Sequence, residues 1–278
     1  MVHALGESTT LAAVSIVGTH DLLFVTLDTL RFDVAVEALA AGRTPNLARV
    51  LPGGSWEMRH SPGTFTFAAH QAFFAGFLPT PARPGRHVRR FALRFAGSES
   101  TGSETEVFDA PDLISGFAAR GYHTLCVGGV GFFNLQNPLG QVLPGFFAER
   151  HWRPELGVTE PRSTEFQVDQ VEESLSRLPA DRRCFTFVNV SALHQPNRFY
   201  VPGATEDSKE THAAALAYVD RHLSRLFSLV ARRAPCLVLI GSDHGTAYGE
   251  DGFHGHRLAH PVVTTVPWAE FTLPKGWA

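Results

Sequence analysis

Four short apolar segments limit the folds open to this 278-residue chain more than any other sequence feature. Each is about 5–7 residues long and is apolar at successive positions, not only at alternate ones. Continuous runs of this kind are typical of strands buried on both faces of a parallel sheet. The segments are residues 22–27, 122–127, 184–190 and 236–240. We therefore expect a largely parallel sheet built around these four strands.

Segments with helical periodicity separate the apolar runs. The predicted helices cover residues 31–41, 66–77, 111–120, 164–178 and 208–233. Strands that alternate with helices favour an α/β fold with a doubly wound, mostly parallel sheet flanked by helices, which binds ligands at the carboxyl ends of its strands. We expect residues 1–278 to form one such domain, with 1–20 as an N-terminal extension and little C-terminal elaboration.

Two further segments are expected to be loops. Residues 96–106 (AGSESTGSETE) are small, polar and acidic, which is typical of a solvated loop. Residues 128–145 are rich in Gly, Phe and Asn, and we expect an ordered, irregular loop near the functional site.

Composition argues against some partners. The formal net charge is −3, only Lys209 and Lys275 are lysines, and no basic tract is present. Nucleic acid is therefore not an expected partner, because binding to a phosphate backbone requires clustered Lys and Arg. The chain has 14 histidines, which favours a site for a metal or for proton transfer.

The cysteines and the N-terminal segment indicate a compartment. Cys126, Cys184 and Cys236 are far apart and lie in apolar runs, so we expect buried, reduced thiols and a cytoplasmic location. The apolar stretch 11–17 is short and follows no basic region. It therefore supports neither a signal peptide nor a membrane-spanning helix, and no membrane partner is expected.

Potential metal ligands directly follow two of the predicted strands. Asp28 ends the segment LLFVTLD, and the pair Asp243-His244 follows CLVLIGS. A carboxylate at the end of an apolar strand is costly unless a positive charge meets it. Asp28 could instead cap a helix or pair with Arg31, and GSDHG could be an ordinary turn. One carboxylate and one imidazole at a strand end suit Zn²⁺ or Mn²⁺.

A third segment places a hydroxyl at the start of a predicted helix. Thr66 precedes an apolar stretch and could serve as an ordinary helix cap. The same position also faces the N–H groups that bind phosphate or sulfate oxygens. A nearby metal would lower the pKa of the Thr66 hydroxyl and make it a usable nucleophile.

Taken in order along the chain, these segments resemble the alkaline phosphatase superfamily, especially its sulfatase-like branch. The resemblance spans roughly residues 20–270 and is greatest to short bacterial sulfatase-like proteins that open, as residues 17–31 do here, with VGTHDLLFVTLDTLR. The matching segments are residues 24–31 (FVTLDTLR), 44–50 (TPNLARV), 66–79 (TFAAHQAFFAGFLP), 187–196 (FVNVSALHQP) and 241–245 (GSDHG), followed by Gly255-His256 and Val266-Pro267.

The resemblance implies roles for individual residues. Asp28, Asp243 and His244 match metal ligands, and Thr66 matches a nucleophile that also lies at the metal. His194 and His256 match positions that hold a second metal, bind oxygens of the transferred group or protonate the leaving group. One or two divalent ions, Zn²⁺ or Mn²⁺, are implied. If this reading holds, the carboxylates of Asp28 and Asp243 lie within about 8 Å of each other.

Departures from the family pattern shape the expected chemistry. Sulfatases convert a Cys or Ser to formylglycine, and Thr66 cannot give that aldehyde. His70 and Thr29 replace an Arg and an Asp of the pattern, and Val190 and Ser191 stand where a mid-chain Asp is usual. We therefore expect a metal-dependent hydrolase or transferase acting on a small phosphate ester, less so a sulfate ester. The alternative is a non-catalytic or partner-dependent member that binds one metal or an anionic ligand.

The other histidines carry weaker signals. His20, His60 and His123 lie beside strands or turns and are expected to be structural or exposed to solvent. His254 and His260 flank His256 and could replace it as the ligand, although the spacing favours His256.

Overall fold

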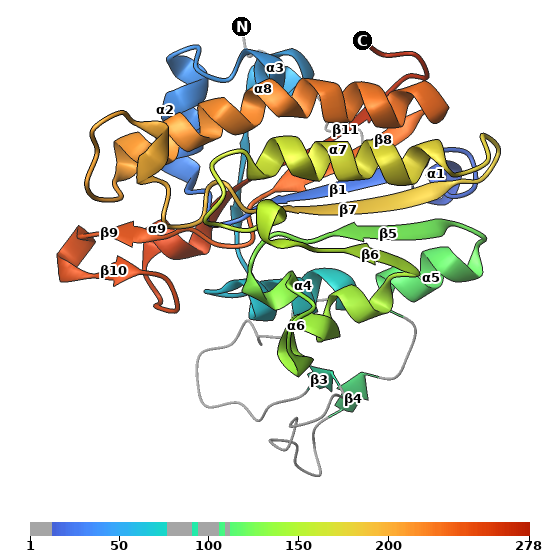
Figure 1. Cartoon of the computed structure of the whole chain (residues 1–278), viewed down its shortest axis with the longest axis horizontal. Coiled ribbons are helices and arrows are strands. Elements are labelled where there is room, and N and C mark those ends of the chain that lie inside the picture. Colours follow the sequence, from blue (N-terminus) through green and yellow to red (C-terminus); the bar gives the residue numbers. More distant parts are fainter. Residues whose placement is uncertain (1–12, 77–90, 94–105, 109–111) are drawn as a thin grey trace, which may run out of the picture.

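A computed structural model describes residues 13–76, 91–93, 106–108 and 112–278, and its centre is a seven-stranded sheet (Figure 1). The strand order is β2-β11-β8-β1-β7-β5-β6. Strands β8, β1, β7, β5 and β6 pair in parallel, and β11 runs antiparallel to β8 and β2. The expected α/β fold with a mostly parallel sheet is therefore confirmed.

All four predicted strands are present, each with bounds within one residue of those expected. They are β1 (Asp21–Leu27), β5 (His123–Val127), β7 (Cys184–Val190) and β8 (Cys236–Gly241). Strand β1 lies at the centre, between β7 and β8. It is fully buried because Leu23, Val25 and Leu27 pack into one core while Leu22 and Phe24 pack into another.

Three strands of the sheet were not predicted. They are β2 (Glu57–His60), β6 (Glu149–His151) and β11 (Thr265–Leu273). The four residues of β2 are exposed at the sheet edge, and β11 alternates between buried and exposed residues and contains Pro267. Neither pattern resembles the continuous apolar runs of the buried strands, and a proline within a run argues against a strand.

Helices cover both faces of the sheet (Figure 1). The upper layer holds α2 (Phe32–Ala40), α3 (Pro45–Val50), α7 (Ser163–Ser176) and α8 (Lys209–Arg233). The lower layer holds α4 (Thr66–Ala75), α5 (Leu113–Ala119) and α6 (Pro138–Val142). The five predicted helices are confirmed with ends within two residues, and a capping box of Ser208 and Thr211 begins α8.

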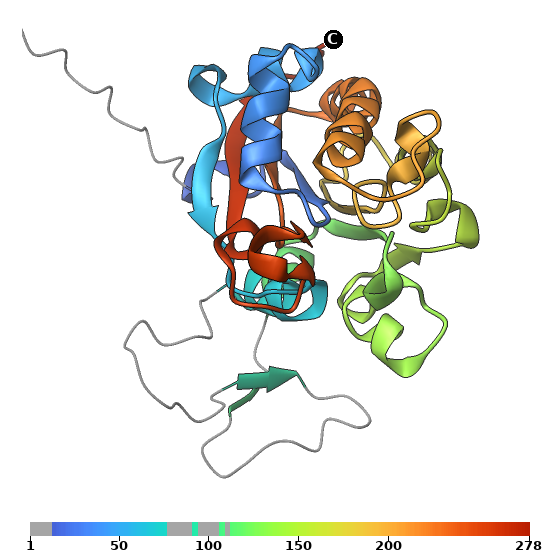
Figure 2. The same cartoon turned by 90° about the vertical axis from the view of Figure 1, so that its left-hand side faces the viewer.

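The remaining elements are short. They are α1 (Ala13–Ile16), β3 (Phe91–Leu93), β4 (Glu106–Phe108), β9 (Ala247–Tyr248), β10 (His254–Gly255) and α9 (Pro261–Thr264). Figure 2 shows β9, β10 and α9, in red, beside the teal helix α4. Except for Glu106, which begins β4, the predicted loop 96–106 lies outside the described residues.

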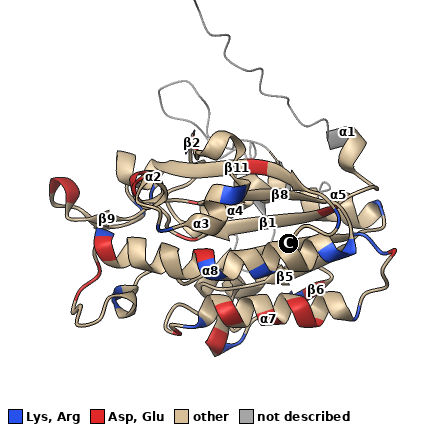
Figure 3. Cartoon of the chain, turned by 90° about the horizontal axis from the view of Figure 1, so that it is seen from above, with Lys and Arg blue, Asp and Glu red and all other residues tan. Residues whose placement is uncertain are grey.

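The three cysteines are buried and form no disulfide, as predicted. The charged residues of α7 are all acidic, whereas α8 carries both basic and acidic residues (Figure 3), and Arg225 of α8 pairs with Asp169 and Glu172 of α7. Among the described helices, none has both the length and the apolar character needed to cross a lipid bilayer.

Asp220 of α8 fixes the start of α3. Its buried carboxylate accepts hydrogen bonds from the backbone N–H groups of Asn46 (3.1 Å) and Leu47 (2.8 Å) and from the Asn46 side chain (3.0 Å). These bonds satisfy N–H groups that a helix cannot satisfy at its own N-terminus. Asp220 therefore has a structural role.

We expect Asp220→Ala to lower the free energy of unfolding by about 2–3 kcal/mol, because several buried donors lose their acceptor. Asp220→Asn keeps one carboxamide oxygen as an acceptor and should cost less. Urea denaturation measures both effects, with Asp181→Ala, at an exposed position, as the control. A D220A protein of unchanged stability, or one that loses its bound metal while staying folded, would contradict this structural role.

Candidate metal centre and active site

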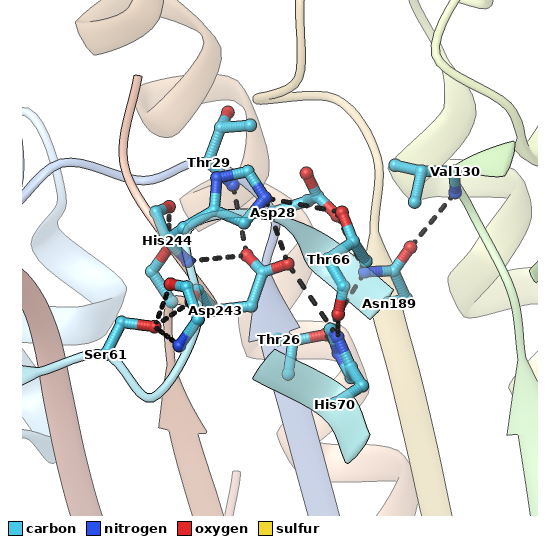
Figure 4. A network of polar contacts seen from close by, with 12 residues as sticks. Thr26, Asp28, Thr29, Ser61, Thr66, His70, Val130, Asn189, Asp243 and His244 are labelled. Atoms are coloured by element: carbon cyan, nitrogen blue, oxygen red, sulfur yellow. Dashed lines mark hydrogen bonds and ion pairs between the residues drawn. The ribbon is translucent and has the colours of Figure 1, made fainter. Parts of the chain in front are cut away.

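The register of two parallel strands brings the candidate ligands together. Thr26 of β1 is paired with Gly241 of β8, so Asp28 and Asp243, each two residues further along, leave the sheet at the same level. Thr66 is the first residue of α4, which begins beside them (Figure 4). Asp28 and Asp243, which the sequence analysis placed directly after two strands, therefore lie together at the carboxyl edge of the sheet.

Asp28, Asp243 and His244 form a compact, buried cluster. One ligand atom from each lies within 4.8 Å of the others, and all three side chains are fully buried. The expectation that the two carboxylates lie within about 8 Å of each other is confirmed. The Thr66 hydroxyl is in the same cluster, since its Oγ1 lies 3.3 Å from Asp28 Oδ2 and 3.3 Å from His244 Nε2.

Each carboxylate has one hydrogen-bonded oxygen and one bare oxygen. Asp28 Oδ2 accepts from Thr66 and from Asn189 Nδ2 (3.1 Å), and Asp243 Oδ1 accepts from the N–H groups of Thr29 (3.2 Å) and His244 (3.0 Å). Within the described part of the chain, Asp28 Oδ1 and Asp243 Oδ2 have no hydrogen-bond partner although they are buried. A buried carboxylate oxygen without a partner is costly, which fits a site that binds a cation.

The pKa values of the cluster agree with that reading. Burial, reinforced by the nearby charge of Asp243, raises the pKa of Asp28 to about 6, and burial raises the pKa of Asp243 to about 7. Burial lowers the pKa of His244, which therefore stays neutral. Burial thus disfavours the two charged carboxylates and keeps the imidazole neutral. A divalent cation would stabilise this set, because it binds carboxylates and neutral imidazole nitrogen.

The His244 ring is oriented as a ligand. Its Nδ1 lies 2.9 Å from the carbonyl oxygen of Gly245, so Nδ1 carries the proton and donates it to that oxygen. The lone pair on Nε2 is then directed toward Thr66 and Asp243. A backbone acceptor that fixes the tautomer in this way is the usual support of a metal-binding histidine. The residues present therefore fit Zn²⁺ or Mn²⁺ held by Asp28, Asp243 and His244, with Thr66 beside it.

Asn189 supports the cluster from β7 and was not predicted. Its Nδ2 donates to Asp28 Oδ2 and to Thr26 Oγ1 (3.2 Å), while its Oδ1 accepts from the N–H of Val130 (3.0 Å). The residue stands one position before Val190, where the family pattern led us to look for a carboxylate. A lone amide inside an otherwise apolar strand was the signal in the sequence, because buried polar side chains need partners.

His70 supports the first turn of α4, which carries Thr66. It is fully buried in α4, its Nδ1 lies 2.7 Å from the Thr66 carbonyl oxygen, and its Nε2 lies 3.1 Å from Thr26 Oγ1. Burial lowers the pKa of His70 to about 3, so the ring is neutral, donates from Nδ1 and accepts at Nε2. His70 therefore positions the first turn of α4 and does not act as the cationic arginine it replaces in the family pattern.

The loops around the cluster are held by close backbone approaches. Ser61 Oγ donates to the carbonyl oxygen of Asp243, and Thr29 Oγ1 donates to that of Leu193 (3.1 Å). Thr29 thus uses its hydroxyl to hold the turn before His194 and does not direct it at the candidate cation. A Cβ added at Gly245 would collide with the carbonyl of Val262, so only glycine fits directly after His244.

His194 and His256 lie beside the cluster. The His256 ring centroid is 4.7 Å from that of His244 and 5.6 Å from that of His194. Burial and the neighbouring imidazoles lower the pKa of His256 to about 3. Both rings line a cavity of about 590 Å³ that also contains Thr66 and residues of the predicted irregular loop, among them Phe132 and Asn134.

The other candidate histidines lie elsewhere. His260 caps α9 by accepting from the Val262 N–H and pairs with Asp251, so it does not replace His256. His254 lines the cavity but is exposed. His123 pairs with Glu149, and His20 contacts Thr19. The alternative in which Asp28 pairs with Arg31 is wrong, because Arg31 binds Asp33 (2.7 Å) while Asp28 faces the cluster.

Comparison with known proteins identifies the family. The profile described as Sulfatase matches residues 20–265, which is most of the chain. The chain belongs to the sulfatase family. No curated protein sequence matches it significantly.

The family match confirms the predicted sulfatase-like resemblance, and several solved structures share the fold of this sulfatase-family chain. The soluble domain of lipooligosaccharide phosphoethanolamine transferase A from Neisseria meningitidis has a TM-score of 0.61 at 16% identity over 91% of this chain and 76% of that domain. The chain spans 48% of the corresponding integral membrane protein.

Two further structures show the same fold. The periplasmic domain of EptC from Escherichia coli, in complex with Zn, has a TM-score of 0.59 at 12% identity over 93% of this chain and 74% of that one. The putative sulfatase yidJ from Bacteroides fragilis has a TM-score of 0.57 at 16% identity over 94% of this chain and 70% of that one. At these identities the likeness concerns the fold.

We expect Asp243→Asn to alter stability in a pH-dependent way in protein stripped of metal. The pKa of Asp243 rises from 3.8 to about 7 on folding, so the folded state binds more protons in this range, and stability is lost as the pH rises. Wild type and D243N should be about equally stable near pH 4.5, whereas at pH 8 the variant should be more stable by on the order of 3 kcal/mol.

Urea denaturation of both proteins at the two pH values measures this difference. Comparing the pair cancels the buried histidines His70 and His256, whose lowered pKa values act in the opposite direction. Added Zn²⁺ at pH 8 should stabilise wild type far more than D243N. The same stability difference at both pH values would show that the Asp243 carboxylate is not held in a costly state.

Proposed function

We propose that this protein is a metal-dependent hydrolase or transferase of phosphate esters that uses Thr66 as its nucleophile. One observation carries the proposal: the Thr66 hydroxyl lies at the start of α4, 3.3 Å from both Asp28 Oδ2 and His244 Nε2, and faces the cavity. A nucleophile, a carboxylate that can accept its proton and an anion-binding helix terminus thus converge on one point.

Asp28, Asp243 and His244 would hold the cation. A divalent ion bound there supplies positive charge that polarises the phosphoryl group and lowers the pKa of the neighbouring hydroxyl. Zn²⁺ and Mn²⁺ suit the two carboxylates and one imidazole. The complex of Escherichia coli EptC with Zn supports the choice of zinc.

The residues of the chain supply the transfer step. Thr66 Oγ1 donates its proton toward Asp28 Oδ2 and forms a bond to phosphorus as the bond from phosphorus to the leaving oxygen breaks. The N-terminus of α4 stabilises the phosphoryl oxygens through its N–H groups and dipole. Water then releases phosphate from Thr66 in a hydrolase, or an acceptor alcohol takes up the phosphoryl group in a transferase.

His194 and His256 would act on the ester from the cavity side. The pKa of His256, about 3, keeps this imidazole neutral at pH 7. That state favours a nitrogen that binds a cation or accepts a hydrogen bond over one that gives a proton to the leaving oxygen. His194, which lines the same cavity, is then the residue that we propose to protonate the leaving group.

Phosphate is favoured over sulfate by the nucleophile itself. A threonine side chain cannot be oxidised to the formylglycine aldehyde, because its Cβ carries a methyl group. The structural neighbours include phosphoethanolamine transferases as well as a putative sulfatase. Phosphate esters and a covalent phosphothreonine fit this residue.

A second candidate function is binding of one metal or an anionic ligand without turnover. It is favoured by the use of Thr29, whose hydroxyl donates to Leu193 and so adds no ligand to the centre. Among the described residues, Asp28, Asp243 and His244 are the one group of three acidic, histidine or cysteine side chains arranged for a metal. This alternative predicts stoichiometric zinc and no turnover of any phosphate ester.

We expect Thr66→Ala to lower turnover of p-nitrophenyl phosphate in Zn²⁺ or Mn²⁺ by at least about a thousandfold, because no other group replaces the attacking oxygen. Thr66→Ser should retain measurable turnover. Release of p-nitrophenolate gives the rate, and mass spectrometry of acid-quenched wild type should find phosphate on Thr66.

The matched control is Thr64→Ala, two residues from the nucleophile and not among the cavity residues, which should keep most of the turnover. Turnover retained by T66A at the wild-type rate would remove Thr66 from its role. Wild type that binds zinc but turns over no aryl phosphate would support the binding function instead.

A further inference from the structure

The lining of the cavity in front of Thr66 contains basic residues but no acidic ones among the described residues. Its described lining carries one arginine, three histidines and three carboxamides, and none of these residues is acidic. The arginine is Arg257, and the histidines are His194, His254 and His256. At about 590 Å³ the cavity has room for a substrate's alcohol part as well as its phosphoryl group.

Arg257 is fixed against the loop that carries the nucleophile. Its backbone is left-handed, with φ +70°, and its N–H donates to the carbonyl oxygen of Thr64 (2.8 Å). Its guanidinium carbon lies 5.4 Å from the ring centroid of Phe65, the residue before Thr66. A left-handed arginine is uncommon and is held only where its surroundings impose it. The side chain is thereby directed along the wall of the cavity.

The charge of Arg257 is not neutralised by the part of the chain that the structure describes. No carboxylate of the described residues lies within ion-pair distance of its guanidinium, which packs over the ring of Phe65. Arg31, by contrast, is paired with Asp33 and Glu250. Arg257 also acts on the site at a distance, because its charge helps to lower the pKa of His244 and of His256.

We propose that Arg257 is a specificity-determining residue that binds a negatively charged substituent on the alcohol part of the substrate and disfavours a positively charged one. The proposal rests on the proposed function, because it takes the cavity as the phosphoester site. The transferred phosphoryl group already has the α4 N-terminus and the candidate cation. An ammonium group in the same cavity would meet Arg257 and find no described carboxylate to pair with.

This charge pattern separates the chain from the phosphoethanolamine transferases that share its fold. An ethanolamine headgroup carries an ammonium group, which a cavity of this lining does not accommodate. Phosphate esters of hydroxy acids or of other anionic alcohols are the class that fits. Neutral alcohols such as glycerol should be intermediate.

Binding of three small phosphate esters to the Zn²⁺-loaded full chain tests the proposal. They are phosphoglycolate, glycerol 3-phosphate and phosphoethanolamine, whose alcohol parts are anionic, neutral and cationic. Calorimetric titration is done under conditions in which no inorganic phosphate is released. Phosphoglycolate should bind most tightly and phosphoethanolamine most weakly, with dissociation constants at least about tenfold apart.

Substitution of Arg257 should then abolish or reverse this order. Arg257→Gly removes the side chain and keeps the left-handed backbone free of strain, so it is the main variant, with Arg257→Gln as the second. Both variants should bind phosphoglycolate about tenfold more weakly and should bind phosphoethanolamine as tightly as wild type or more tightly. Arg257→Glu should prefer phosphoethanolamine. The matched control is Arg198→Gln, because Arg198 also lies over a phenylalanine, 6.0 Å from the ring centroid of Phe199, but outside the cavity.

Several results would overturn the proposal. An equal loss for all three esters in R257G would show that Arg257 binds only the phosphoryl group. An unchanged order in the variants, or no binding of any ester to wild type, would also refute it. These outcomes are independent of the nucleophile, because a binding order set by Arg257 stands even if T66A keeps its turnover, and turnover through Thr66 stands even if the order does not change.

Discussion

Two buried carboxylates that face each other with one bare oxygen apiece are the constraint on which the rest of this structure depends. Asp28 and Asp243 would repel each other if both were ionised without a cation, and burial already makes ionisation costly. The surrounding residues donate hydrogen bonds to the other oxygen of each carboxylate, Asp28 Oδ2 and Asp243 Oδ1. Backbone N–H groups hold Asp243, and Asn189 with Thr66 holds Asp28. These hydrogen bonds fix the orientation of each carboxylate before a cation binds.

The fold holds these side chains in fixed positions. Parallel pairing of β1 with β8 and β7 sets the height at which Asp28, Asp243 and Asn189 stand, and both faces of β1 are packed into apolar cores. Helix α4 is joined to the same edge by His70, which contacts both the Thr66 carbonyl and Thr26 of β1. The candidate nucleophile and the candidate ligands are thus parts of one scaffold, and such preorganisation is what catalysis by positioning requires.

Sequence reasoning succeeded where a residue's surroundings are encoded locally. The central strands were predictable because they are apolar on both faces, whereas β11 was not, because its antiparallel pairing and Pro267 are decided by β8 and β2. Asp28, Thr66, Asp243 and His244 were found through motif order. Asn189 and Arg257 were missed. The amide of Asn189 in an apolar strand signals a buried partner but does not say which one, and the contacts of Arg257 are with residues distant in the chain.

The amide of Asn189 also sets the electrical balance of the centre. Asn189 bonds to Asp28 without adding a third negative charge, and His244 is neutral, so two carboxylates provide the whole anionic charge of the cluster. An ion of charge two makes the buried site neutral. A singly charged ion would leave a negative excess and a trivalent one a positive excess, each expensive away from water. A cation bound by these residues would therefore be selected by its charge.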